Sequence, residues 1–181
     1  MKFILKYLFV FCILPVLAPA QVYLSGLSSN PEITNYLKKT DYFPSTKAAN
    51  VSFEPLILPF MDDFSNDGPF PDATKWLDSA VYINAHYPIF PVDYGVATFD
   101  ILNDTGGIYT NANVFPIKAD YLTSYPIRLD STFDSDLGTS WKVTPADSLY
   151  FSFYYQPQGR GDAPLSYDSL SLEFGTNDSV F

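Results

Sequence analysis

Residues 147–174 constrain the fold most, because they join two runs of strand-forming residues through a loop of turn-forming ones. The first run, 149–155, is almost entirely aromatic, and the second, 170–174, alternates apolar and polar residues. Two prolines and two glycines lie between them. Aromatic runs and period-two alternation favour strands, whereas proline and glycine favour turns. We therefore predict that the two runs are antiparallel neighbours in one sheet.

The rest of the chain carries further strand signals of the same kind. Seventeen of its twenty acidic residues are Asp, Tyr and Phe together number thirty, and fifteen prolines separate the apolar runs. Such residues form helices poorly and strands well. The predicted strands lie at 56–60, 79–84, 95–100, 121–129 and 141–144. About seven short strands predict an all-β fold, a two-sheet antiparallel sandwich of the jelly-roll type.

The first twenty residues have the pattern of a secretory signal peptide. Lys2 and Lys6 precede an apolar run at 8–17, and small residues lead to Ala20 and Gln21, between which we predict cleavage. The apolar run is short for a membrane span, so we expect none in the mature chain, although an uncleaved N-terminal anchor is the alternative. Cys12, the only cysteine, lies in this segment. We therefore expect a secreted or outer-surface protein without disulfides.

The charge of the chain restricts its partners. The formal net charge is −10, and removal of the two signal-peptide lysines leaves eight basic residues against twenty acidic ones. Nucleic acids and anionic membranes need a basic surface, so neither is an expected partner. An acidic exported chain is compatible with Ca²⁺ and with cell-surface or extracellular glycans or proteins.

The span between the signal peptide and the first strong strand signal has only weak secondary-structure signals. We interpret 21–55 as a weakly structured leader and 56–181 as the sandwich domain. Within the leader, 31–39 has the composition of a short helix, with Asn30 as N-cap and Pro31 at the first helical position.

Several of these features occur together in a known class of protein. They are residues 62–65, Trp76, 82–84, 95–100, 119–124 and 151–157. In this order they resemble large exported surface proteins of the Bacteroidetes, many with a type IX secretion sorting domain and some linked to gliding. The resemblance covers about 56–174 and implies a domain type and a secretion route. It extends more distantly to MAM-type and concanavalin-like jelly rolls, although the cysteines of MAM modules are missing here.

A jelly roll has about eight strands, and about seven are predicted here. We therefore hypothesise that the chain is the N-terminal part of a longer protein and that its sandwich is incomplete. Such a chain exposes an unpaired strand edge.

The loop at 62–72 is the candidate metal site. Asp63, Asn66 and Asp67 could supply oxygen ligands to Ca²⁺, although their spacing differs from that of the helix-loop-helix calcium loop. Asp and Asn also favour turns, because their side chains bond to the nearby backbone. Turn formation is the favoured interpretation and Ca²⁺ the alternative.

No residue set predicts catalysis. His86 is the only histidine, and Glu32, Glu54 and Glu173 lie in unrelated contexts. Imidazole catalysis, zinc binding and glycoside hydrolysis each need partners that this pattern does not supply. The tripeptide at 160–162, Arg-Gly-Asp, is interpreted as a turn, with cell adhesion as the alternative.

Four Asp-Ser-aliphatic tripeptides, at 78–80, 147–149, 168–170 and 178–180, look like the O-glycosylation sites of exported Bacteroidetes proteins. The alternative is that each Asp-Ser pair simply precedes the start of a strand. The aromatic run at 149–155 could form a sugar-stacking face, but its bulk on both faces favours a buried central strand. We expect a non-enzymatic structural or adhesive domain. The alternatives are a carbohydrate-binding module, or an accessory domain of a hydrolase whose catalytic part lies beyond Phe181.

Overall fold

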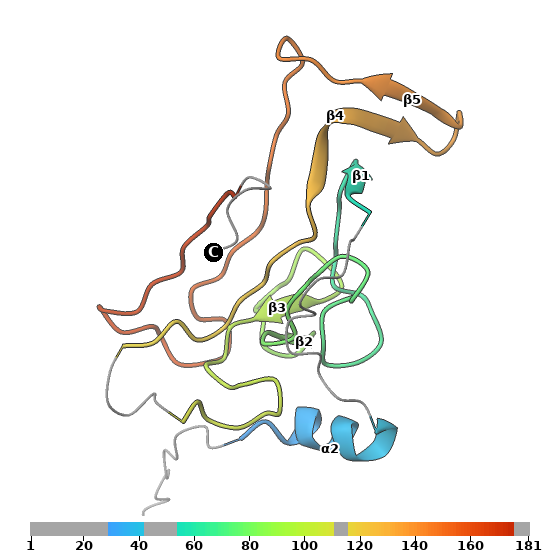
Figure 1. Cartoon of the computed structure of the whole chain (residues 1–181). Coiled ribbons are helices and arrows are strands. Elements are labelled where there is room, and N and C mark those ends of the chain that lie inside the picture. Colours follow the sequence, from blue (N-terminus) through green and yellow to red (C-terminus); the bar gives the residue numbers. More distant parts are fainter. Residues whose placement is uncertain (1–28, 42–53, 111–115, 176–181) are drawn as a thin grey trace, which may run out of the picture.

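The computed structural model describes residues 29–41, 54–110 and 116–175. These form one helix and two small sheets (Figure 1). The elements are α2 (Pro31–Thr40), β1 (Leu56–Leu58), β2 (Tyr82–Asn84), β3 (Val96–Thr98), β4 (Ile127–Asp134) and β5 (Thr139–Lys142). One sheet has the order β1-β4-β5 and the other pairs β2 with β3. The described part of the chain is thus β-rich, as predicted.

The β2–β3 sheet contributes to the hydrophobic core through β2. The two strands are antiparallel, with Tyr82 opposite Thr98, and every residue of β2 is buried. At the end of β2, the Asn84 side chain donates to the Thr98 hydroxyl over 2.7 Å and accepts the backbone N–H groups of His86 and Tyr87. Asn84 thereby turns the chain away from the sheet without leaving a buried amide unpaired.

Helix α2 is as the sequence predicts at its start. The Asn30 side chain accepts from the N–H groups of Glu32 (3.0 Å) and Ile33 (3.3 Å), which satisfies two of the free donors at the helix N-terminus. Ile33 is 2% exposed and packs with Phe70 and Tyr82. This part of the predicted leader therefore belongs to the hydrophobic core. Residues 21–28 and 42–53 of that span lie outside the described residues.

The second sheet departs from the predicted antiparallel order. β4 and β5 form a hairpin in which Thr132 lies opposite Trp141, but β1 runs parallel to β4. About seventy residues separate β1 from β4, and a parallel pair requires such a long connection instead of a tight turn. The sheet is therefore mixed. Figure 1 shows the β4–β5 hairpin extending away from the β2–β3 sheet.

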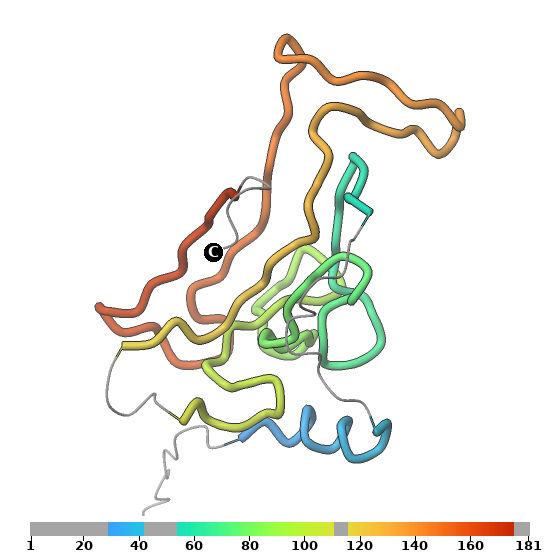
Figure 2. Tube along the Cα trace, viewed as in Figure 1, coloured from blue at the N-terminus to red at the C-terminus, as the bar shows by residue number. Residues whose placement is uncertain are grey.

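The predicted strands at 149–155 and 170–174 are wrong in pairing and in burial. Residues 143–175 contain no strand, and their trace runs along one side of the molecule (Figure 2). Tyr150 is 90% exposed and Phe174 is 75% exposed, so the expected buried central strand is absent from this segment. Strand propensity favours an extended backbone, but a strand also needs a partner for its ladder. The predicted strand at 121–129 likewise begins only at Ile127, directly after Pro126, whose missing N–H cannot join a ladder.

Candidate functional site

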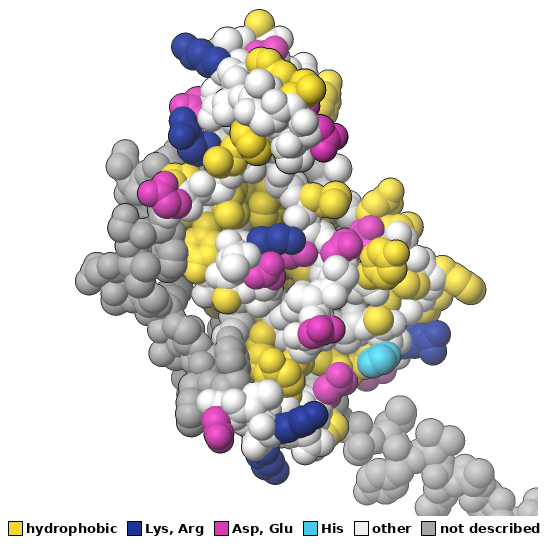
Figure 3. Space-filling view, turned by 90° about the vertical axis from the view of Figure 1, so that its right-hand side faces the viewer, with side chains coloured by type: hydrophobic (Ala, Val, Ile, Leu, Met, Phe, Trp, Pro, Cys, Tyr) yellow, Lys and Arg dark blue, Asp and Glu magenta, His cyan; other side chains and the backbone are white. Residues whose placement is uncertain are grey.

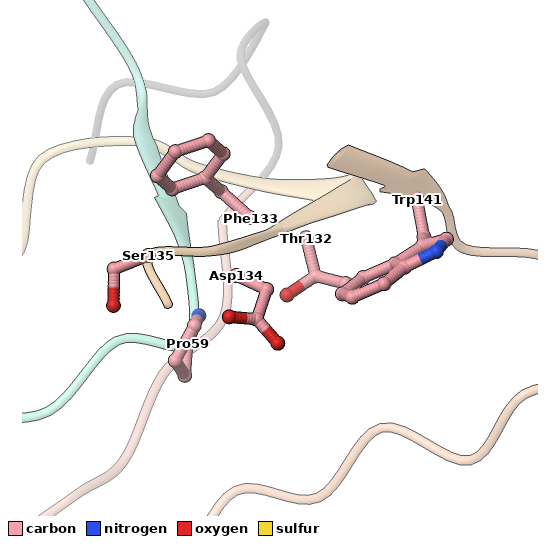
Figure 4. A pocket seen from close by; sticks show the side chains of 6 residues that line it. All are labelled: Pro59, Thr132, Phe133, Asp134, Ser135 and Trp141. Carbon is pink, nitrogen blue, oxygen red and sulfur yellow. The ribbon is translucent and has the colours of Figure 1, made fainter. Parts of the chain in front are cut away.

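A hollow opens where the β4–β5 hairpin meets the end of β1. Its volume is about 250 Å³, which is smaller than the roughly 300 to 1,000 Å³ of typical small-ligand pockets. The residues that line it are Pro59, Thr132, Phe133, Asp134, Ser135 and Trp141. Figure 4 shows the Thr132 hydroxyl, the Asp134 carboxylate and the Trp141 indole on one side of β4, with the Phe133 ring on the other.

Strand geometry places these groups together. Thr132 and Asp134 are two residues apart on β4 and therefore share a face, and Trp141 on β5 lies directly opposite Thr132. The Thr132 hydroxyl donates to the Leu58 carbonyl over 2.9 Å, which ties the hollow to β1. The sequence did not predict this site, because β4 was expected to end before Thr132.

Asp134 has a divided role. One carboxylate oxygen, Oδ1, accepts the N–H groups of Asp136 (2.8 Å) and Leu137 (3.0 Å) and so holds the hairpin turn. The other oxygen, Oδ2, has no hydrogen-bond partner among the described residues. The hollow therefore offers a fixed carboxylate oxygen as an acceptor.

The remaining lining supplies apolar surface and hydroxyls. The Trp141 side chain is 48% exposed, and Pro59 lies across the hollow from it (Figure 4). The Thr132 oxygen retains acceptor capacity after donating to Leu58, and the Ser135 hydroxyl can donate or accept. An aromatic face beside several hydroxyl-binding groups suits a ligand that has both apolar and hydroxylated surfaces.

Two of the three predicted calcium ligands, Asp63 and Asn66, bond to the nearby backbone. The Asp63 carboxylate accepts the Ser65 N–H over 3.2 Å, and hydrogen bonds from Ser65 lower the pKa of Asp63. The Asn66 amide donates to the Phe70 carbonyl over 2.6 Å, while its Oδ1 atom is buried without a partner. Among the residues described, no three or more His, Cys, Asp or Glu side chains are grouped as a metal site. Calcium binding by Asp63, Asn66 and Asp67 stays a prediction.

Asp62, next to the predicted calcium ligands, has a structural role instead. Its carboxylate accepts from Lys75 Nζ over 3.0 Å and from Trp76 Nε1 over 2.5 Å, and its side chain is 5% exposed. Phe60 and Phe64 pack against the Trp76 ring at centroid distances of 5.5 and 5.9 Å. The acidic-aromatic and tryptophan features of the resemblance thus meet in one cluster.

A second acidic cluster lies around Asp120, and the sequence did not predict it. The Asp120 carboxylate accepts from the Tyr109 hydroxyl (2.9 Å) and from the Ile101 N–H (2.8 Å). Burial raises the pKa of Asp120 to about 6, with Asp100 adding to the rise. Burial also raises the pKa values of Asp100 and Asp104. The cluster ties 100–102 to the segment ahead of β4, and its raised pKa values predict that its contribution to stability changes with pH.

The other sequence motifs take ordinary positions. His86 is exposed, and its N–H bonds to Asn84 at the end of β2. In the Arg-Gly-Asp tripeptide, the Arg160 N–H donates to the Tyr87 carbonyl over 2.7 Å. Of the two glycines expected to permit the turn, Gly159 has a positive φ of 57°, whereas Gly161 does not. The Arg-Gly-Asp turn is therefore confirmed, and it depends on Gly159.

The Asp-Ser motifs at 147 and 168 form the same device. Each Asp carboxylate accepts the N–H of the residue three positions earlier, and each Asp N–H donates to that residue's carbonyl. The earlier residues are Thr144 and Leu165. Ser148 and Ser169 are exposed and accessible for modification, and glycosylation stays a prediction. Ala20, Gln21 and the motif at 178–180 lie outside the described residues.

α2 is the one helix in the described part of the chain, and its ten residues are too few to cross a membrane. Comparison of the chain with protein-family models, with curated proteins and with solved structures gives no match.

Proposed function

We propose that this protein is an exported, non-catalytic adhesive domain that binds a neutral saccharide in the hollow between β1, β4 and β5. The observation that carries the proposal is the half-exposed Trp141 indole beside the unpartnered Oδ2 atom of Asp134. A sugar ring has apolar C–H faces and an edge of hydroxyl groups. The indole can stack on the C–H face, and the carboxylate and hydroxyls of the hollow can form hydrogen bonds with the sugar hydroxyls.

The charges favour a neutral sugar over an acidic one. Asp134 is the one ionisable group that lines the hollow, and the chain as a whole carries a formal net charge of −10. A uronic or sialic acid would place a second negative charge close to Asp134, and like charges repel. Neutral hydroxyls instead donate to the carboxylate.

The lining also favours binding over hydrolysis. Cleavage of a glycosidic bond generally uses two carboxyl groups, one as acid and the other as base or nucleophile. The hollow has one, and half of it holds the hairpin turn. An accessory domain of a secreted hydrolase would bind a glycan in the same way, which makes it the second form of this proposal.

Export and architecture complete the proposal. The pattern around Ala20 and Gln21 favours secretion, and the resemblance favours a type IX-secreted protein of the cell surface. We place the two small sheets in a two-layer sandwich of the jelly-roll type. The separate β1-β4-β5 and β2-β3 sheets are compatible with that arrangement.

Titration calorimetry with neutral mono- and oligosaccharides tests the binding site. We expect dissociation constants of about 1 mM or lower, as for a single stacking site with a few hydrogen bonds. Trp141→Ala should weaken binding at least tenfold, and Trp141→Phe should retain part of it because a ring remains. Leu137→Ala is the matched control, because Leu137 lies in the same hairpin and is exposed but does not line the hollow.

The proposal fails if Trp141→Ala binds as the wild type does, or if no neutral saccharide binds at 10 mM, about ten times the expected constant. Export is tested separately by the N-terminal residue of the native protein. Mass spectrometry of surface-exposed protein should find a chain that begins at Gln21.

A further inference from the structure

Two extended segments, 148–156 and 169–175, run along one side of the molecule (Figure 2) and are exposed; we call them the open segments. Their side chains are aromatic or aliphatic at most positions. Tyr150, Tyr154 and Phe174 are 90%, 79% and 75% exposed. Singly exposed apolar residues are normal, but a contiguous set of this kind marks an interaction surface.

The open segments are held in place at their ends. The Asp147 and Asp168 turns precede them, with side-chain hydrogen bonds of 2.8 Å to the Thr144 N–H and 2.7 Å to the Leu165 N–H. The Gln156 side chain accepts the Ile89 N–H and donates to the Ile89 carbonyl, as a strand neighbour would. The ring centroids of Phe151 and Phe174 are 5.8 Å apart, so the two segments lie side by side there.

Among the described residues, the backbone of the open segments has no partner strand. No backbone–backbone hydrogen bond of the described residues involves 148–156 or 169–175. The nearby backbone hydrogen bonds lie outside the two segments and join Asp147 to Thr144, Arg160 to Tyr87, Gly161 to Gln158 and Asp168 to Leu165. An extended backbone with free N–H and C=O groups is a template for another strand. A sugar or an apolar protein face would leave most of these groups unpaired.

The charge around the open segments selects among possible strands. Neither segment contains Lys or Arg, and Asp147, Asp168 and Glu173 flank or lie within them. A second copy of this chain would bring a formal net charge of −10 to the same surface. A strand with basic residues is attracted instead, since complementary charge favours association.

We propose that the open segments accept an extended, lysine- or arginine-bearing strand of another polypeptide by backbone pairing. Apolar side chains on one face of that strand would cover the exposed aromatic rings, and basic side chains on the other would face the flanking carboxylates. This surface is separate from the β4–β5 hollow and does not rest on saccharide binding.

Three nine-residue peptides test the proposal. The first alternates Lys and Val, the second alternates Glu and Val, and the third is the Lys–Val peptide with every second amide N-methylated. The third keeps charge and apolar surface but loses backbone donors on one edge. Fluorescence anisotropy gives the affinities, and hydrogen–deuterium exchange of the full chain locates the bound peptide.

We expect the Lys–Val peptide to slow exchange within 148–156 and 169–175 and to bind at least tenfold more tightly than either other peptide. Phe153→Pro removes one backbone donor from an open segment and should weaken binding severalfold with an unchanged melting temperature, because Phe153 N–H has no partner among the described residues. Phe153→Ala keeps the donor and is the matched control.

Three results would overturn the proposal. Equal binding of the N-methylated peptide would show that side chains alone make the contact. Protection at other residues would place the strand elsewhere. Protection that rises with protein concentration without peptide would identify a second copy as the occupant.

Discussion

Asp62 joins three parts of the loop at 60–76 through one carboxylate. It accepts the N–H of Phe64, the ammonium of Lys75 and the indole N–H of Trp76, and water has little access to it. Removal of one member of such a buried set leaves the others desolvated and unpaired, which costs more than the set contributes when complete.

Asp62→Asn should therefore destabilise the protein. The amide keeps the shape but replaces one acceptor oxygen with an NH₂ group that opposes a donor, and we expect a loss of about 3 kcal/mol. Urea unfolding followed by Trp fluorescence measures it. Asp63→Asn is the control, because Asp63 accepts the Ser65 N–H in a turn and lacks the Lys75 and Trp76 contacts. Equal midpoints for the two variants would contradict this role for Asp62.

Gly95 marks a close approach of two backbones. A Cβ atom there would lie 2.0 Å from the Phe64 carbonyl oxygen, and the Gly95 N–H donates to the Asp63 carbonyl over 3.0 Å. Gly95→Ala should cost about 2 kcal/mol or more, because backbone must shift. Thermal unfolding compares it with Gly107→Ala, where the nearest atom to the added carbon is at 3.6 Å. A melting temperature of Gly95→Ala equal to that of Gly107→Ala would exclude the clash.

At the scale of elements, the sequence predicts the features that depend on neighbouring residues and misses those that depend on distant ones. Asn30 and Pro31 predict where α2 begins, because capping acts within four residues of the helix start. β2 and β3 lie within their predicted ranges, since twelve residues or so separate them and the turn signals between them are dense. These features depend on neighbours in sequence.

The hollow and the open segments depend on distant residues. The parallel pairing of β4 with β1 brings Pro59 and Asp134 into the lining of one hollow. This pairing joins residues about seventy positions apart, so local patterns do not predict it. Likewise, the composition of 149–155 predicts an extended backbone but not whether a partner strand is present. Figure 3 shows exposed hydrophobic side chains in several places on this face of the molecule. Local sequence patterns cannot predict which apolar residues stay exposed.

The loop between the open segments is anchored at Gly159. Its φ is 57°, and a Cβ atom there would lie 2.6 Å from the Tyr87 carbonyl oxygen, which accepts the Arg160 N–H. Gly159→Ala should release this anchor, and exchange of the Arg160 amide should become faster while the core amides of β2 stay protected.

Gly161→Ala is the matched control, because its added carbon would meet only the Gln158 carbonyl oxygen, at 3.5 Å. Hydrogen–deuterium exchange resolved at single amides compares the two variants. Unchanged protection of Arg160 in Gly159→Ala would mean that the loop is held elsewhere.

For the whole molecule, the buried carboxyl groups set the pH dependence of stability. Burial raises the pKa of Asp120 from its ordinary value of 3.8 to about 6, so the folded state holds a proton that the unfolded chain has already released. Between about pH 4 and pH 6 the folded state binds more protons, and the free energy of unfolding falls as the pH rises. The raised pKa values of Asp100 and Asp104 act in the same direction.

Other carboxyl groups act in the opposite direction and at lower pH. Hydrogen bonds from Thr74 lower the pKa of Asp72, and those from Thr144 lower the pKa of Asp147. Their contribution is present above about pH 4 and is lost as the pH falls further. Stability should therefore pass through a maximum near pH 4 to 5, well below neutrality.

Asp120→Asn tests which group causes the fall in unfolding free energy above about pH 4. A difference of one in pKa corresponds to about 1.4 kcal/mol, so Asp120 accounts for about 2 to 3 kcal/mol of the decline between pH 4 and pH 7. The variant cannot titrate at this position, and its unfolding free energy should decline less by that amount. Urea unfolding at half-unit pH steps measures how the unfolding free energy of each protein depends on pH.

Asp130→Asn is the control, because Asp130 is exposed and pairs with Arg128, so this variant should keep the wild-type slope above pH 4. A wild-type slope in Asp120→Asn would assign the pH dependence to Asp100 and Asp104 instead.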